Sequence, residues 1–276
     1  MFGMDRIEYK SPDQVLVMRR AGLVVADALD AVRAAAVVGA STADLDAVAA
    51  EVIARAGATP SFLGYEGYPA TICVSVNDEV VHGIPGDRVL EPGDVVSVDC
   101  GAVVDGWHGD AAFTTVLPAA DAADVALAAT TERAMWAGIA ALAACSHLDG
   151  VGEAVETVVA AAAHGGPGYG IVEEYVGHGI GTEMHQDPDV LNYRARGRGA
   201  KVRPGLCVAV EPMLTAGEAG TRVLDDDWTV VTEDGSRAAH WEHTVAVLDG
   251  GIWVLTARDG GAAGLAAHGV TPTPLD

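Results

Sequence analysis

The stretches LEPGDVVSVD (90–99) and VRPGLCVAVE (202–211) repeat one pattern in the two halves of the chain. Each has a Pro-Gly turn, an apolar strand and an acidic residue seven positions after the proline. Each also leads to a second acidic strand, GDAAFTTVL from Gly109 and EHTVAVL from Glu242. Two ordinary hairpins could give the same repeat, but acids in strands that should be buried favour a duplicated unit with a shared site.

Helices and strands alternate around this repeat. Ser11-Pro12 is a capping signal for a helix that extends to Val37, and a second helix is expected from Thr42 to Gly57. Asp105-Gly106 marks a hairpin turn between two strands. Further helices are predicted at 121–145 and 150–164, and strands at 70–77, 95–104, 111–117, 171–176, 206–214, 228–232, 240–248 and 252–256.

Four carboxylates occupy matching places on the duplicated unit: Asp99, Asp110, Glu211 and Glu242. Burying a carboxylate costs several kcal/mol unless it is paired or bound to a metal. We therefore expect the four to converge on divalent cations of the Mn, Fe, Co or Zn kind. Carboxylates of this type can bridge two ions about 3.5–4 Å apart.

Histidines add candidates for the same site. GHGIGTEMHQDP (177–188) carries His178 and His185, which by themselves could be metal ligands, a catalytic pair or turn residues. His82, in VVHGIPG, could equally be an ordinary loop histidine. His243 should point to the opposite strand face from Glu242. The remaining histidines are expected to be structural or exposed: His108, His147, His164, His240 and His268.

Composition excludes several classes of protein. A formal charge of −23 argues against nucleic-acid binding, and the longest apolar run, 134–145, is too short to cross a bilayer. There is no apolar signal-peptide segment near the N-terminus, and the four cysteines are scattered, so a reducing cytoplasmic location is expected. Neither a Gly-rich phosphate loop nor a nucleophile-elbow serine is present.

Taken together, the motifs resemble the type I methionine aminopeptidases, which have the pita-bread metallopeptidase fold. The segments that carry the resemblance are FLGYEGYPATICVSVNDEVVHGIP, DVVSVDCGAVVDGWHGD, GHGIGTEMHQDP, VEPM and EHTVAV. The resemblance implies an α+β fold with pseudo-two-fold duplicated halves and a curved, mostly antiparallel sheet covered by helices. It also implies one catalytic domain over 1–276, with a lead-in at about 1–10. The composition of the segment at about 259–276, which is rich in Gly, Ala and Pro, predicts a loose tail.

The resemblance further implies a role for each matching residue. Two divalent ions would activate a water that attacks the first peptide bond, with Glu211 as general base and His82 and His185 handling the substrate. His185 would donate to the oxyanion. The implied metal ligands are Asp99, Asp110, His178, Glu211 and Glu242, and the implied substrate-binding residues are Tyr65, Tyr68, Cys73, His82, Met184, His185 and Trp228.

The implied activity is removal of the initiator methionine from nascent polypeptides whose second residue is small, by a monomer working in the cytoplasm, transiently near the ribosome. Two alternatives are an X-Pro aminopeptidase or dipeptidase of the same fold, and a non-catalytic binding protein that has lost its metals. Glu183-Met184 and Phe62 depart from the family pattern, which predicts an altered wall of the methionine pocket.

Overall fold

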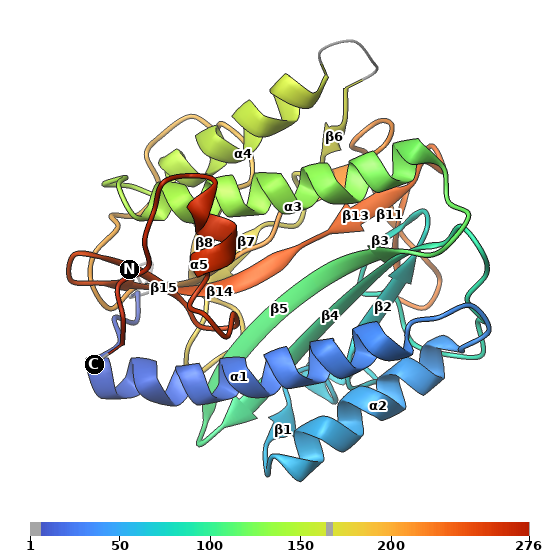
Figure 1. Ribbon diagram of the computed structural model, residues 1–276, viewed down its shortest axis with the longest axis horizontal. Coiled ribbons are helices and arrows are strands. Elements are labelled where there is room, and N and C mark those ends of the chain that lie inside the picture. The colour runs from blue at the N-terminus through green and yellow to red at the C-terminus, as the bar shows by residue number, and fades with distance from the viewer. Residues whose placement is uncertain (1–6, 164–167, 276) are drawn as a thin grey trace, which may run out of the picture.

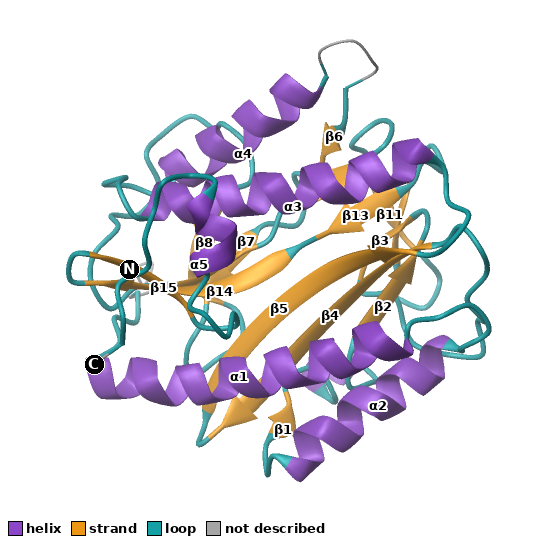
Figure 2. Cartoon of the chain, viewed as in Figure 1, coloured by secondary structure: helices purple, strands orange, loops and turns teal. Residues whose placement is uncertain are grey.

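The computed structural model describes residues 7–163 and 168–275. Long helices and a central sheet form the framework of the described chain (Figure 2). The helices are α1 (Pro12–Ala35), α2 (Thr42–Arg55), α3 (Ala122–Leu142), α4 (Asp149–Ala162) and α5 (Ala262–Ala266), with a short 3-10 turn, η1 (Tyr65–Gly67). The strands are β1 (Thr59–Pro60), β2 (Cys73–Val76), β3 (Glu79–Val81), β4 (Val95–Val104), β5 (Trp107–Val116), β6 (Gly170–Ile171), β7 (Gly177–Gly179), β8 (Gln186–Val190), β9 (Cys207–Val210), β10 (Met213–Thr215), β11 (Thr221–Val223), β12 (Val230–Thr232), β13 (Ala238–His240), β14 (Glu242–Leu248) and β15 (Gly251–Val254).

The first half of the fold is the β4–β5 hairpin with α1 and α2 packed beside it (Figure 1). All ten residues of β4 pair with β5, and the turn has Asp105 at φ 49° and Gly106 at φ 80°. These positive φ values are those of the hairpin turn that the Asp-Gly pair predicts. Helix α1 begins as expected, because the Ser11 hydroxyl accepts from the Gln14 amide at 3.3 Å in a capping box.

The second half repeats this arrangement with β9, β14 and β15, and with α3 and α4 packed on the same face of the sheet that α1 and α2 cover (Figure 1). Strand β14 also pairs with β5, where Glu242 lies opposite Ala112, and this pairing joins the halves. Within the described residues the main sheet has nine strands, ordered β1-β4-β5-β14-β9-β7-β8, with β2 on β4 and β15 on β14. The acidic strands of both halves therefore meet at the centre of one sheet.

Two predicted strands are each broken in two. The segment 206–214 forms β9 and β10 with Glu211-Pro212 between them, and 240–248 forms β13 and β14 with Trp241 between them. Pro212 has no N–H to donate to a strand ladder, which ends β9 beside Glu211. The segment 171–176 was expected to be a strand, but only β6 is regular there.

The C-terminal segment differs from its expectation, and the prediction of a loose tail is wrong for the described residues 259–275. Leu265 of α5 is fully buried, and the Thr273 amide donates to the Ile252 carbonyl at 2.9 Å. The small residues that made this segment look loose allow close packing instead. A Cβ on Gly264 would lie 2.2 Å from the Trp136 ring.

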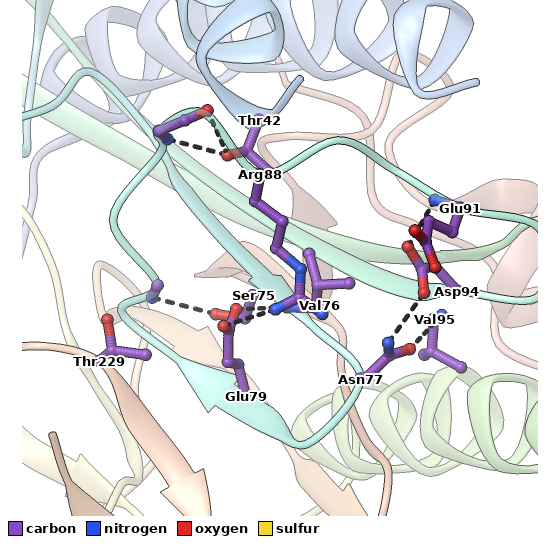
Figure 3. Close-up of polar contacts among 12 residues, drawn as sticks. Thr42, Ser75, Val76, Asn77, Glu79, Arg88, Glu91, Asp94, Val95 and Thr229 are labelled. Atoms are coloured by element: carbon purple, nitrogen blue, oxygen red, sulfur yellow. Dashed lines mark hydrogen bonds and ion pairs between the residues drawn. The ribbon is translucent and has the colours of Figure 1, made fainter. Parts of the chain in front are cut away.

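A polar network fixes the turn between β2 and β3, and β3 leads to His82 (Figure 3). The Val76 amide donates to Glu79 at 2.7 Å, and Arg88 forms an ion pair with the same carboxylate. Asn77 donates to Asp94 at 2.8 Å, which ties the turn to the residues before β4. The turn is thus held by side chains, in addition to the pairing of β2 with β4 and of β3 with β12.

Candidate metal centre and active site

A cavity of about 160 Å³ opens beside the centre of the main sheet. It brings together segments that are far apart in the sequence. Every site residue predicted from the sequence lines it: Asp99, Asp110, His178, Glu211 and Glu242 on one side, and Tyr65, Tyr68, Cys73, His82, Met184, His185 and Trp228 around the rest. Phe62, Glu66 and Val81 complete the lining.

Strand pairing places the carboxylates. Asp99 lies opposite Ala112 in the β4–β5 hairpin, and Ala112 lies opposite Glu242 of β14. The Asp110 amide donates to the Thr244 hydroxyl at 3.0 Å, and that hydroxyl donates back to the Asp110 carbonyl at 2.7 Å. This clamp locks β5 to β14, so that carboxylates 132 positions apart (110 and 242) face one cavity.

The carboxylate cluster fits a divalent cation. Ligand atoms of Asp110, His178 and Glu242 all lie within 4.8 Å of one another. Four buried carboxylate oxygens have no hydrogen-bond partner within the described ranges: Asp99 Oδ1, Asp110 Oδ1, Glu211 Oε1 and Glu242 Oε1. Unpartnered anionic oxygens in a protein interior are costly, and a cation between them would satisfy all four.

Burial disfavours the ionised form of every member of the cluster. It raises the pKa of Asp99 to about 7. Burial, followed by repulsion from a neighbouring aspartate of the cluster, raises the pKa values of Asp110, Glu211 and Glu242 well above their usual range. A bound cation would reverse this effect, because it stabilises the charged carboxylates that coordinate it.

His178 is oriented as a metal ligand would be. Its Nδ1 lies 2.9 Å from the Gly179 carbonyl, which can only accept, so Nδ1 carries the ring proton. Burial lowers the pKa of His178 to about 3, which keeps the ring neutral. The bare Nε2 then faces Glu211 Oε1 at 3.3 Å. Two lone pairs at that separation repel unless a metal ion, or a proton on the carboxyl, lies between them.

Two further histidines line the substrate side. His82 has a φ of 60°, an uncommon backbone conformation for a residue with a Cβ, and its ring packs edge-on against Tyr175 and Trp228. Burial lowers the pKa of His82 to about 4. His185 Nδ1 lies 2.8 Å from the Tyr65 hydroxyl, and burial lowers its pKa as well. Both rings are therefore neutral near pH 7.

An apolar wall closes the other side of the cavity. Phe62, Tyr68, Ala70, Cys73 and Met184 form one buried cluster, and Tyr65 and Trp228 pack against it. Met184 is only 3% exposed, so the departure from the family pattern lies in the wall itself. The Tyr68 hydroxyl donates to the Ile72 and Gly83 carbonyls, which fixes its ring in the wall.

Sequence reasoning missed His240. The residue was expected to be structural or exposed, but its Nε2 lies 3.7 Å from Glu211 Oε2 in the interior. One signal was available, because His240 follows two alanines in a strand and precedes Glu242 by two positions. His243 behaves as predicted: it turns away from the cavity, and its Nδ1 lies 2.8 Å from the Thr256 hydroxyl. His164 lies outside the described residues.

Residues 17–249 match metallopeptidase family M24. The chain belongs to this family. It is 55% identical to methionine aminopeptidase 1 of Mycobacterium tuberculosis over 91% of this chain and 95% of that protein. The M24 fold also superposes on the crystal structure of the Thermotoga maritima methionine aminopeptidase with a TM-score of 0.87 and 37% identity, covering 92% of this chain and all of that one.

A more distant neighbour in fold is the prolidase of Pyrococcus furiosus, with a TM-score of 0.70, 17% identity and coverage of 90% of this chain and 65% of that one. These comparisons confirm the predicted pita-bread fold and favour the methionine aminopeptidases over the proline-specific alternative. M24 membership and the Asp-His-Glu cluster both indicate divalent metal binding. No helix in the described ranges is long and apolar enough to cross a membrane.

Proposed function

We propose that this M24 chain is a methionine aminopeptidase that removes N-terminal methionine when the next residue is small. One observation carries the proposal: an apolar wall and a carboxylate-histidine cluster face each other across the same cavity. A methionine side chain in contact with the wall would have its peptide bond beside the cluster. The 55% sequence identity with methionine aminopeptidase 1 of Mycobacterium tuberculosis supports the same activity.

The proposed metal ligands are Asp99, Asp110, His178, Glu211 and Glu242, holding two divalent ions of the Mn, Fe, Co or Zn kind. Their unpartnered oxygens and the bare Nε2 of His178 support this assignment. When bound, such ions polarise the peptide carbonyl and supply a nucleophilic water near neutral pH. The protein contributes the orientation of these donors and the exclusion of bulk water around them.

The remaining chemistry belongs to side chains. We assign Glu211 as the base that takes a proton from the attacking water and returns it to the leaving amine, because its carboxylate lines the cavity among the proposed metal ligands. His185 would donate from Nε2 to the oxyanion, a contribution worth about 2.7–4 kcal/mol for one such donor. His82, held between Tyr175 and Trp228, would contact the scissile amide.

The wall suits methionine. An unbranched, polarizable thioether makes favourable contacts with aromatic rings and other sulfur groups. Tyr65, Tyr68 and Trp228 supply rings, and Cys73 and Met184 supply sulfur. The Tyr68 and Trp228 rings meet edge to face with centroids 5.0 Å apart, so they define one side of the pocket. The natural substrates would be nascent polypeptides, met by a monomer in the cytoplasm, transiently near the ribosome.

The test compares two tripeptides after the protein is stripped of metal and each ion is titrated back. We expect hydrolysis of Met-Ala-Ser and none of Ala-Pro-Ala. Hydrolysis of Ala-Pro-Ala alone would favour the proline-specific alternative. Failure to cleave either peptide with Mn, Fe, Co or Zn would overturn the proposal, and failure to bind any of them would favour a non-catalytic protein.

Variants of the same protein test the roles. Glu211→Gln removes the proposed base and should abolish turnover, whereas the exposed helical Glu51→Gln should leave turnover unchanged. His185→Ala should lower kcat about 100–1,000-fold and leave metal affinity intact. If His185→Ala lost metal affinity as strongly as it lost kcat, His185 would belong among the metal ligands instead.

A further inference from the structure

We propose that His240 is a positioning residue: its Nε2–H holds one oxygen of Glu211 and turns the other toward the metal-ligand cluster. The inference deepens the proposed function and rests on it. It begins with an interior imidazole that sequence reasoning gave no role. His240 is 1% exposed, and its Nε2 has no hydrogen-bond partner in the described part of the chain.

The backbone of His240 is firmly anchored, so its ring has a fixed origin. The His240 amide donates to the Thr114 hydroxyl at 2.9 Å. That hydroxyl donates to the His240 carbonyl at 2.7 Å, which completes a closed pair of bonds between β5 and β13. The Ser97 hydroxyl lies 2.9 Å from that of Thr114 and supports the pair. From this anchor the ring points its Nε2 at Glu211.

Glu211 is flanked by two imidazoles of opposite character. On one side, His178 presents a bare Nε2 to Oε1 at 3.3 Å, because the Gly179 carbonyl fixes its proton on Nδ1. On the other side, His240 presents Nε2 to Oε2 at 3.7 Å. A bare nitrogen on both sides would leave the carboxylate with two repulsive neighbours. A proton on His240 Nε2 makes this neighbour a donor instead.

This asymmetry gives the two oxygens of Glu211 different tasks. Oε2 faces the donor, and Oε1, which is unpartnered, faces His178 and the cavity. The separation of 3.7 Å is longer than a hydrogen bond, and contacts of this kind often shorten only when an active site is loaded. Partners that orient a ligating carboxylate typically change metal affinity or activity about 10–100-fold when they are removed.

Three substitutions at one position test the proposal. His240→Gln places an amide N–H about where imidazole Nε2 lies, His240→Asn places it about where Nδ1 lies, and His240→Leu supplies none. The readouts are Mn²⁺ affinity of the stripped protein by calorimetry, kcat and KM on Met-Ala-Ser, and the Tm of the stripped protein. The Tm identifies any variant that is impaired only because it folds poorly.

We expect His240→Leu and His240→Asn to lose about 10–100-fold in Mn²⁺ affinity and in kcat, with KM little changed, and His240→Gln to recover most of both. A His240→Gln protein as impaired as His240→Leu, at equal Tm, would overturn the proposal. So would a His240→Leu protein with the affinity of the wild type. If the wild type cleaves no methionine peptide, the proposed function fails, and the Mn²⁺ titration still decides the role of His240.

Discussion

The hydroxyl of Tyr65 lies 2.8 Å from Nδ1 of His185, which joins the short turn η1 to a segment 120 residues later. A neutral imidazole that donates from Nε2 must accept at Nδ1, and the Tyr65 hydroxyl is the donor placed to supply that bond. The ring centroids are 5.3 Å apart and meet edge to face, so Tyr65 also restricts the rotation of His185. The contact prepares His185 for the oxyanion role proposed for it.

Tyr65→Phe should therefore lower kcat and leave KM and Tm nearly unchanged. A hydrogen bond worth about 0.5–1.5 kcal/mol corresponds to a fall of roughly 2–13-fold. The matched control is Tyr68→Phe, which removes two bonds to backbone carbonyls and should lower Tm instead. Steady-state kinetics and a thermal melt separate the two effects, and an unchanged kcat in Tyr65→Phe would refute the tautomer argument.

Met184→Ala should change which N-terminal residue is preferred. Its side chain is buried in the pocket wall, so truncation opens space where the substrate methionine would bind and costs up to about 2–5 kcal/mol of stability. We expect kcat/KM for Met-Ala-Ser to fall. The ratio of kcat/KM for peptides with a bulkier N-terminal residue to kcat/KM for Met-Ala-Ser should rise. Met135→Ala, in a different core cluster, should lose stability with no shift in that ratio. Equal ratios in both variants would contradict a specificity role.

Gly83→Ala should disturb His82. A Cβ at Gly83 would lie 2.3 Å from the Val74 carbonyl oxygen, so the backbone after His82 must move. We expect a Tm lower by several degrees and weaker binding of substrate, measured as a higher KM. Gly86→Ala is the control, because nothing lies within 4 Å of its added Cβ. A Gly83→Ala protein that melts and turns over like Gly86→Ala would show that the close approach is tolerated.

Removing metal should make stability depend on pH in a defined direction. A carboxylate whose folded pKa is raised favours the folded state when protonated, so its contribution is lost as pH rises from the unfolded to the folded pKa. For Asp99 that window extends to about 7, and the other three carboxylates act in the same direction from their ordinary pKa values upward. The neutral buried histidines act in the opposite sense, since their folded pKa values lie below 6.5, and their effect is complete above that pH.

The Tm of protein in chelator should consequently fall as the pH rises above 6.5, where the carboxylates act without opposition from the histidines. Added Mn²⁺ should abolish the fall, because it neutralises the same carboxylates. Asp99→Asn should reduce the slope in chelator, whereas the exposed Asp13→Asn should not. A Tm that is flat, or that rises over this range in chelator, would contradict the raised pKa values.

Several features of this protein follow from local sequence alone. The Ser11 cap, the Asp105-Gly106 turn and the apolar strands that contain Asp99 and Glu211 are each encoded within a few residues, because caps, turns and periodic burial depend on neighbours in the chain. The repeated Pro-Gly-strand-acid pattern favoured a duplicated unit, and the resemblance to the methionine aminopeptidases implied the residues that line one cavity.

Tertiary structure decided what those residues touch. The Asp110–Thr244 clamp spans 134 positions, and the contact of His240 with Glu211 depends on the pairing of β13 with β10, where His240 lies opposite Met213. The tail packs because Gly264 can meet the Trp136 ring, a fact that its composition concealed. Local patterns show which side chains must be buried, but the partner of a buried group is set by packing between distant segments. For that reason the metal-ligand candidates could be chosen from sequence, and the imidazole that orients one of them could not.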